Sequence, residues 1–85
     1  MMSSSSPSSI DRLHIRILEC LSEDHYFHSN EIYGWVAGDY PNPAIFLRHL
    51  EDLIGWGYIE FEFDRGYRRT RLGSRVAKEY REAMA

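Results

Sequence analysis

Several features that mark common protein classes are missing from this chain. It has a single cysteine, Cys20, so no disulfide can form within it, and this suits a reducing compartment. No apolar run approaches the roughly 20 residues that a membrane-spanning helix needs. A glycine-rich phosphate loop, a nucleophile elbow and a patterned pair of acids are also absent. The sequence therefore predicts neither an enzyme nor a membrane protein, and we expect a cytoplasmic location.

Side chains that bind metals or cofactors are sparse. His25 and His28 are three residues apart and Cys20 lies nearby, but a structural zinc site needs four ligands. Trp35 and Trp56 either line a ligand pocket or pack in the core, and packing explains them at least as well. The sequence therefore predicts no metal and no cofactor, and it identifies no small-molecule effector.

Basic residues are scarce through most of the chain and concentrated at its end. The 85 residues include 10 basic and 13 acidic side chains, for a net charge of −3. Residues 1–64 hold three basic and eleven acidic side chains, a balance of −8, whereas residues 65–85 hold seven and two, a balance of +5. Because DNA meets a local surface rather than a net charge, this polarised chain is compatible with DNA binding.

The length and composition predict one folded domain. Residues 1–9 are rich in serine and have no apolar segment typical of a signal peptide, so we expect a disordered leader. Residues 10–85 are enough for a single domain with one modest core, and no internal repeat is present.

Two short helices are predicted first. The first helix is expected to begin after Ser9 as its cap and to end near Leu21. Ser29 is expected to cap the second helix, with Glu31 in its first turn, and Gly38 is expected to end it in the left-handed conformation. Between them, residues 26–27 form a very short strand. The apolar positions expected to share the buried face of the first helix are Ile10, Leu13, Ile17, Leu18 and Leu21.

The third helix, residues 42–56, has a clear beginning. Pro43 has no N–H to lose at the first helical position, and it forces Asn42 into the extended conformation of a cap. Gly57 then ends the helix in a left-handed turn. The side chains expected to be buried are Phe46, Leu47, Leu50, Leu53 and Ile54; those left for the exposed sides are Ala44, Ile45, Arg48, His49, Glu51 and Asp52.

A hairpin and a last helix complete the predicted fold. Apolar and acidic residues alternate over 58–63, residues 64–66 have turn chemistry, and a basic strand returns over 67–71. Thr70 is expected to cap the last helix. The predicted apolar stripe of that helix is Leu72, Val76, Tyr80 and Ala83 or Met84. The predicted class is α+β, mostly α, with three helices, a two- or three-stranded hairpin and a C-terminal helix.

Four motifs in order resemble the winged helix-turn-helix regulators of the MarR, PadR and ArsR kind. Residues 45–59 resemble the rhythm T-V-x-R-H-L-x-x-L-x-x-x-G-L-I, and residues 67–73 resemble Y-x-x-T-x-x-G. Residues 29–32 are similar to the start of the second helix in those families. Small archaeal and viral winged-helix repressors share this compact form. Ile45 and Leu47 depart from the small hydroxyl residues that are usual there.

The resemblance implies sequence-specific binding of double-stranded DNA. Helix 42–56 would enter the major groove, and the 58–71 wing would lie on the backbone or in the minor groove. The predicted contact residues are Ser29, Asn30, Asn42, Ala44, Ile45, Arg48, His49, Arg65, Arg68, Arg69 and Arg71. Arg48 is the best single candidate, with pairing to Asp52 as the alternative. Arg65 and Arg68 are expected to stay free, although Glu60 and Glu62 can pair with Arg68 or Arg71 across the hairpin.

Three readings of the function follow from these patterns. The first is a homodimeric transcriptional repressor that blocks polymerase. The residues that would pair with a second copy are Tyr80, Ala83 and Met84, or Ile10 and Leu13. Alternatively, these residues only complete the core of one domain. The second is a winged-helix module that binds protein, supported by the acidic balance of residues 1–64, with hot spots at Tyr33, Trp35 or Trp56. The third is a ligand- or metal-sensing switch.

Overall fold

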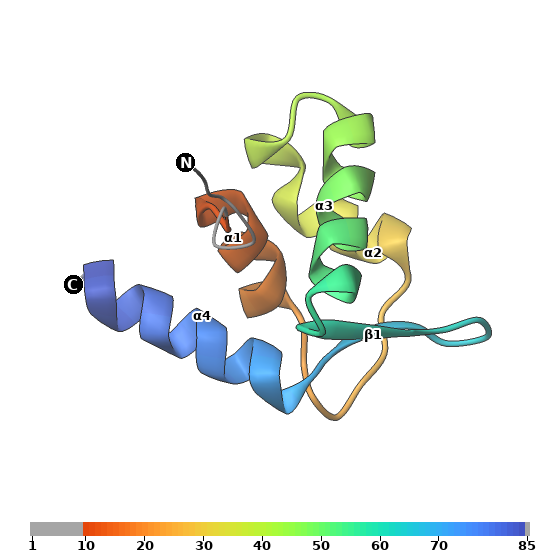
Figure 1. Cartoon of the computed structure of the whole chain (residues 1–85). Helices are drawn as coiled ribbons and strands as arrows, with labels where there is room; N and C mark the ends of the chain where they lie inside the picture. The colour runs from red at the N-terminus through yellow and green to blue at the C-terminus, as the bar shows by residue number, and fades with distance from the viewer. Residues whose placement is uncertain (1–9, 85) are drawn as a thin grey trace.

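Helices form both ends of the fold, and a two-stranded sheet follows the third of them. The computed structural model describes residues 10–84, so the predicted leader at residues 1–9 lies outside the described residues (Figure 1). The elements are α1 (Arg12–Cys20), α2 (Ser29–Val36), the 3-10 helix η2 (Ala37–Asp39), α3 (Pro43–Gly55), β1 (Ile59–Glu62), β2 (Gly66–Arg69) and α4 (Arg71–Met84). The α+β, mostly helical class is confirmed. No helix within residues 10–84 is long and apolar enough to cross a membrane.

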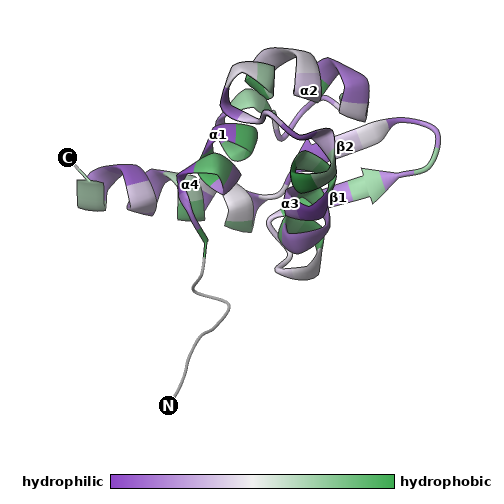
Figure 2. Cartoon of the chain, turned by 90° about the horizontal axis from the view of Figure 1, so that it is seen from above, coloured by the Kyte–Doolittle hydropathy of each residue, from purple (hydrophilic) through white to green (hydrophobic). Residues whose placement is uncertain are grey.

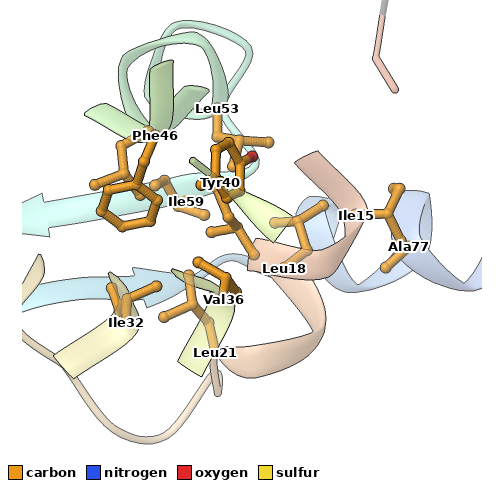
Figure 3. Close-up of a cluster of buried hydrophobic side chains, with 12 residues drawn as sticks. Ile15, Leu18, Leu21, Ile32, Val36, Tyr40, Phe46, Leu53, Ile59 and Ala77 are labelled. Atoms are coloured by element: carbon orange, nitrogen blue, oxygen red, sulfur yellow. The ribbon is translucent and has the colours of Figure 1, made fainter. Parts of the chain in front are cut away.

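One apolar core holds these elements together. Helix α1 packs against α2, α3 and α4, while β1 packs against α3. Figure 3 shows side chains from every α-helix and from β1 meeting in this core. Its buried members are Ile15, Ile17, Leu18, Leu21, Ile32, Val36, Tyr40, Phe46, Leu50, Leu53, Ile59 and Ala77. Burial of each large side chain stabilises the fold by about 1.5–3 kcal/mol.

Helix α1 begins two residues later than predicted, and its cap is Asp11 rather than Ser9. The Asp11 carboxylate accepts hydrogen bonds from the backbone N–H groups of Leu13 at 2.8 Å and His14 at 3.3 Å. The buried face also differs from the prediction, because His14 and Ile15 are buried whereas Leu13 is only half-buried. Contact with both α3 and α4 widens the buried side of α1 beyond one stripe.

The connection from α2 to α3 differs from the predicted left-handed turn. Ser29 was expected to cap α2, but the cap is His28 and Ser29 is the first helical residue, with the Glu31 carboxylate accepting the His28 N–H at 2.9 Å. Gly38, however, lies within η2, and the positive-φ glycines of the described chain are Gly57 and Gly66. The helix tightens into a 3-10 turn because the buried Tyr40, whose N–H bonds to Ala37, holds the chain there.

Helix α3 begins as predicted but buries a narrower face. The Asn42 side chain accepts the Ala44 N–H at 2.9 Å, and Gly57 has a φ of 82° at the other end. Leu47 and Ile54 were expected to be buried, but they are 49% and 39% exposed. Phe46, Leu50 and Leu53 are the buried residues of α3 and make its contact with the core. The neighbouring side of the helix therefore remains exposed to solvent.

The hairpin is antiparallel, and it is tied to the chain before α2. Glu60 lies opposite Arg68, and Phe61 lies opposite Tyr67. Phe27 extends this pairing by exchanging backbone hydrogen bonds of 2.9 and 2.8 Å with Tyr67, which confirms the very short strand. The close approach requires glycine at position 66, because a Cβ there would lie 2.4 Å from the Phe27 carbonyl oxygen.

Helix α4 touches the rest of the fold mainly through small residues. Thr70 caps it as predicted, accepting the Gly73 N–H at 3.0 Å and donating to the Gly57 carbonyl at 2.7 Å. Gly73 and Ala77 are its buried residues, whereas Leu72, predicted to pack inward, is exposed. Figure 2 shows the carboxyl end of α4 extending away from the other helices.

The contact at Gly73 generates the first prediction. A Cβ at this position would lie 2.0 Å from the Tyr58 carbonyl oxygen, so Gly73→Ala must displace the start of α4. We expect the free energy of unfolding to fall by about 2–4 kcal/mol in urea denaturation. Gly34→Ala is the matched control, because nothing lies within 4 Å of a Cβ there. It should stabilise helix α2 by about 0.5–1 kcal/mol, and equal losses in both variants would contradict the close contact.

Candidate nucleic-acid interface

The amino-terminal half of α3 exposes a small group of predicted contact residues. Asn42, Ala44, Ile45 and Arg48 are all exposed. The Asn42 side-chain oxygen caps the helix, which leaves its NH2 group free of that task. Arg48 forms no ion pair within residues 10–84, because the Asp52 carboxylate bonds to His14 Nε2 at 3.1 Å instead. The alternative of an Arg48–Asp52 pair is therefore not found, and the guanidinium is available to a ligand.

The rest of the exposed surface of α3 is apolar or acidic. Leu47, Glu51 and Ile54 fall on one flank by helical spacing, and all three are exposed. Burial raises the pKa of the Tyr67 hydroxyl in β2, and the negative charge of Glu51 raises it further. The exposed side of α3 is therefore mixed, with its basic group limited to Arg48.

His49 lies away from the exposed side on which it was expected. Its Nδ1 is 2.5 Å from the Tyr40 hydroxyl, and its ring stacks on His14 with the centroids 3.9 Å apart. Burial lowers the pKa of His49, and the neighbouring His14 lowers it further. The expected exposure was wrong because the helix turns this position toward α1. A neutral imidazole here offers no charge to a phosphate.

Two of the three arginines of the hairpin, Arg65 and Arg68, lie beside the Tyr26 ring. Arg68 donates to the Glu60 carboxylate directly opposite it at 2.9 Å, and its guanidinium lies 4.7 Å from the centre of the Tyr26 ring. The expectation that Arg68 stays free is therefore wrong, while the cross-strand pairing is confirmed. Arg65, in the turn, lies 5.6 Å from the same ring and forms no ion pair within the described chain.

Arg69 serves the fold rather than the surface. Its Nη1 donates to the Leu18 carbonyl at 2.7 Å, and its Nε is buried without a partner among the described residues. Leu18 lies in the last turn of α1, where a cation is favourable because the helix dipole is negative there. Arg69 therefore joins the hairpin to α1 and is not an exposed contact as predicted.

The first half of α4 carries a basic row that the site prediction missed except for its first member. Arg71, Arg75 and Lys78 are exposed and recur at helical spacing, and none forms an ion pair within residues 10–84. The acid-free run from residue 65 to 78 is the signal that could have identified them.

The fold brings the predicted residues together in two groups. Ser29 and Asn30 begin α2 directly after the bridge between Phe27 and Tyr67, so they lie beside the hairpin with Arg65 and Arg68. Residues 42–45 lie at the end of α3 that is away from the hairpin, as Figure 1 shows. A ligand that touches both groups must therefore follow the length of α3.

Comparison of the chain with protein-family models, with curated proteins and with solved structures finds no match to any of them. The resemblance of residues 29–32, 45–59 and 67–73 to winged-helix regulators therefore stays a prediction from those motifs alone.

The lowered pKa of His49 generates the second prediction. Because its folded pKa lies below the usual value of about 6.5, the unfolded chain takes up the proton first as the pH falls. The contribution of His49 to stability is thus present above about pH 6.5 and is lost as the pH falls from there through the folded pKa. We expect His49→Gln to lose less stability than the parent protein between pH 7.5 and 5 in urea denaturation with EDTA. The exposed His25→Gln is the control, and equal pH slopes in all three proteins would sink the prediction.

Proposed function

We propose that the protein binds double-stranded DNA as a winged helix-turn-helix repressor. The observation that carries the proposal is the set of exposed arginines without ion pairs, Arg48 on α3, Arg65 in the hairpin turn and Arg71 at the start of α4. The element order of helices, hairpin and helix supports it, because winged-helix proteins use this order to read DNA.

In this proposal the first two turns of α3 enter the major groove. Arg48 donates two hydrogen bonds to a guanine edge, which is the commonest specific contact of an arginine. The Asn42 NH2 group bonds to a base or a phosphate, and Ile45 meets a thymine methyl. The small side chain of Ala44 allows the start of α3 to approach the DNA closely. These contacts supply the sequence preference.

The hairpin acts as the wing and positions the protein on the backbone. Arg65 and the remaining N–H groups of Arg68 bind phosphates or reach into the minor groove, and Arg71 adds a phosphate contact. The backbone N–H groups at Ser29 and Asn30, at the positive end of the α2 dipole, bind another phosphate. Such contacts carry little sequence information, but they release counterions and make the affinity fall with salt.

Dimerisation would double the footprint on a palindromic site. A groove of about 410 Å³ between α1 and α4 is lined by Ile15, Tyr80 and Met84 among others, and Met84 is 69% exposed. A second copy of α4 would cover these side chains. The homodimer would then occupy a promoter in the cytoplasm and exclude polymerase.

A second candidate function is binding of a protein partner. It is favoured by the exposed apolar side chains Trp35, Leu47, Phe61 and Phe63, the last of which is 90% exposed. Large apolar groups grouped on a surface mark sites of protein interaction more often than sites of DNA contact. This function predicts no dependence of binding on the wing arginines.

The DNA proposal is tested by a fluorescence-anisotropy titration of random-sequence duplex DNA at two salt concentrations. We expect binding that weakens steeply with salt, and Arg65→Ala should reduce the slope of log K against log salt by about 1. Arg48→Ala should weaken binding to a selected operator more than binding to random DNA, because it removes a base contact. Arg16→Ala on α1, which removes the partner of Asp39, makes the same charge change outside the DNA contacts and is the control. Because Arg16 also lines the groove between α1 and α4, the control requires the same oligomeric state as the parent protein.

Two outcomes would count against DNA binding. Equal affinities of the parent protein and Arg65→Ala at both salt concentrations would show that the wing does not contact DNA. No binding at low salt would favour the protein-partner function, whose own test is loss of partner binding in Phe63→Ser and Leu47→Ser with the arginines intact.

A further inference from the structure

A cluster of polar side chains joins the start of α1 to the middle of α3. Asp11, His14 and His49 each offer one oxygen or nitrogen atom, and the three atoms lie within 4.8 Å of one another. His14 is 3% exposed, whereas the Asp11 side chain is 57% exposed. The cluster is thus held by the core on one side and open to solvent on the other, which provides a path for a small ion.

The surroundings of His14 prepare one of its nitrogens as a ligand. Its Nε2 lies 3.1 Å from the Asp52 carboxylate, which holds the ring proton on Nε2. The lone pair is therefore on Nδ1, 3.4 Å from Oδ1 of Asp11, and it accepts the Asp11 backbone N–H at 3.1 Å. A bound ion would replace this hydrogen bond and leave the N–H to solvent. A carboxylate behind a histidine in this way orients the ring and raises its basicity in metal sites.

His49 is oriented in the same manner by a different partner. Its Nδ1 contacts the hydroxyl of the buried Tyr40, which can accept a hydrogen bond from the ring N–H as well as donate one. When Nδ1 carries the proton, Nε2 has its lone pair free for a metal. The rings of His14 and His49 are stacked, with 27° between their planes, so a rotation of His49 is needed to direct both lone pairs at one point.

We propose that Asp11, His14 and His49 form a binding site for a divalent transition-metal ion of the zinc kind. Two imidazoles and one carboxylate are the protein ligands of many open zinc sites, in which water takes the remaining position. Ligands of this kind favour zinc, nickel or copper over magnesium and calcium, which prefer oxygen. Asp52 and Tyr40 are positioning residues that orient the two histidines.

The ligand spacing fits such an ion after a small movement. Zinc bonds to nitrogen and oxygen are about 2.0–2.2 Å long, so tetrahedral ligand atoms lie about 3.3 Å apart. Oδ1 of Asp11 and Nδ1 of His14 are 3.4 Å apart, which is close to this separation, but Oδ1 also caps α1. Oδ2 takes no part in the cap, so it would have to turn toward the ion to bind it without loss of the cap. The exposed Asp11 and the His49 ring supply the remaining movement.

The proposed ion would connect the start of α1 to α3 across the core. His14 and His49 lie on different helices far apart in the sequence, which is why spacing along the chain gave no sign of the site. The sequence predicted no metal from Cys20, His25 and His28. The new site is formed by other residues, and it does not rest on the proposed DNA binding.

The test is titration of Co²⁺ and Zn²⁺ into the full-length protein after removal of metal with EDTA and dialysis. We expect one ion per chain, visible-range absorption of the Co²⁺ form that zinc abolishes, and a rise in Tm of about 5 °C at zinc concentrations well above Kd. Asp11→Asn keeps the helix cap, because asparagine caps as well as aspartate, but it lacks the second carboxylate oxygen. This variant and His49→Gln should each weaken binding at least tenfold while the Tm without metal stays near that of the parent protein.

His25→Gln with His28→Gln is the control, since both histidines are exposed and outside the cluster. Unchanged zinc affinity in this double variant, together with the losses above, supports the site. The proposal is overturned if binding persists in Asp11→Asn and His49→Gln and disappears in the double variant. Absence of binding up to millimolar zinc overturns it as well. A weaker, roughly tenfold loss in Asp52→Asn would identify the positioning role, because carboxylates behind ligating histidines have effects of about 10–100-fold.

Discussion

The packing of α1 against three other helices is the constraint on which the rest of this fold depends. Ile15, Ile17 and Leu18 are buried from this helix, and α2, α3 and α4 all contact it. The polar contacts follow the same plan. The Leu18 carbonyl receives the Arg69 guanidinium from the hairpin, and His14 bonds to Asp52 on α3. A short nine-residue helix would be marginal alone, so its stability comes from these contacts.

Four of the nine arginines in the sequence are engaged within the fold. Arg69 lies against the carboxyl end of α1, and Arg68 is paired with Glu60 and lies on Tyr26. Arg16 and Arg81 are paired with Asp39 and Glu19. Exposed pairs such as these do little for stability because water screens them, but they remove cations from any electrostatic contact with a ligand. The charge balance of residues 65–85 overstates the positive surface accordingly.

The features that were predictable from the sequence are those decided by neighbouring residues. Pro43 after Asn42, Gly57 and the Thr70 cap all act within one turn of the chain, and each occurs where the pattern placed it. The exposure of Leu47 and the burial of His14 were not predictable in this way. Both depend on which side of a helix meets a distant element, and a helical stripe does not specify how wide that contact is.

The candidate site divides along the same line. Arg48 was identifiable because its exposure follows from the spacing of α3, although its freedom from Asp52 follows only from the hydrogen bond to His14. Arg69 was misplaced because its partner lies 51 residues away in α1. The cluster of Asp11, His14 and His49 could not be found from spacing, since two of its members come from different helices that only the core brings together.

The order of side chains along the exposed ridge of α3 limits how the helix can meet DNA. Ala44, Arg48, Glu51 and Gly55 follow one another on this ridge at helical spacing. In the proposed complex the first two would face the groove, but Glu51 one turn later would meet phosphates and be repelled. Insertion of α3 is then restricted to its amino-terminal half. Because the hairpin lies at the opposite end of α3, a duplex that meets both the start of α3 and the wing would have to follow the length of the helix past Glu51.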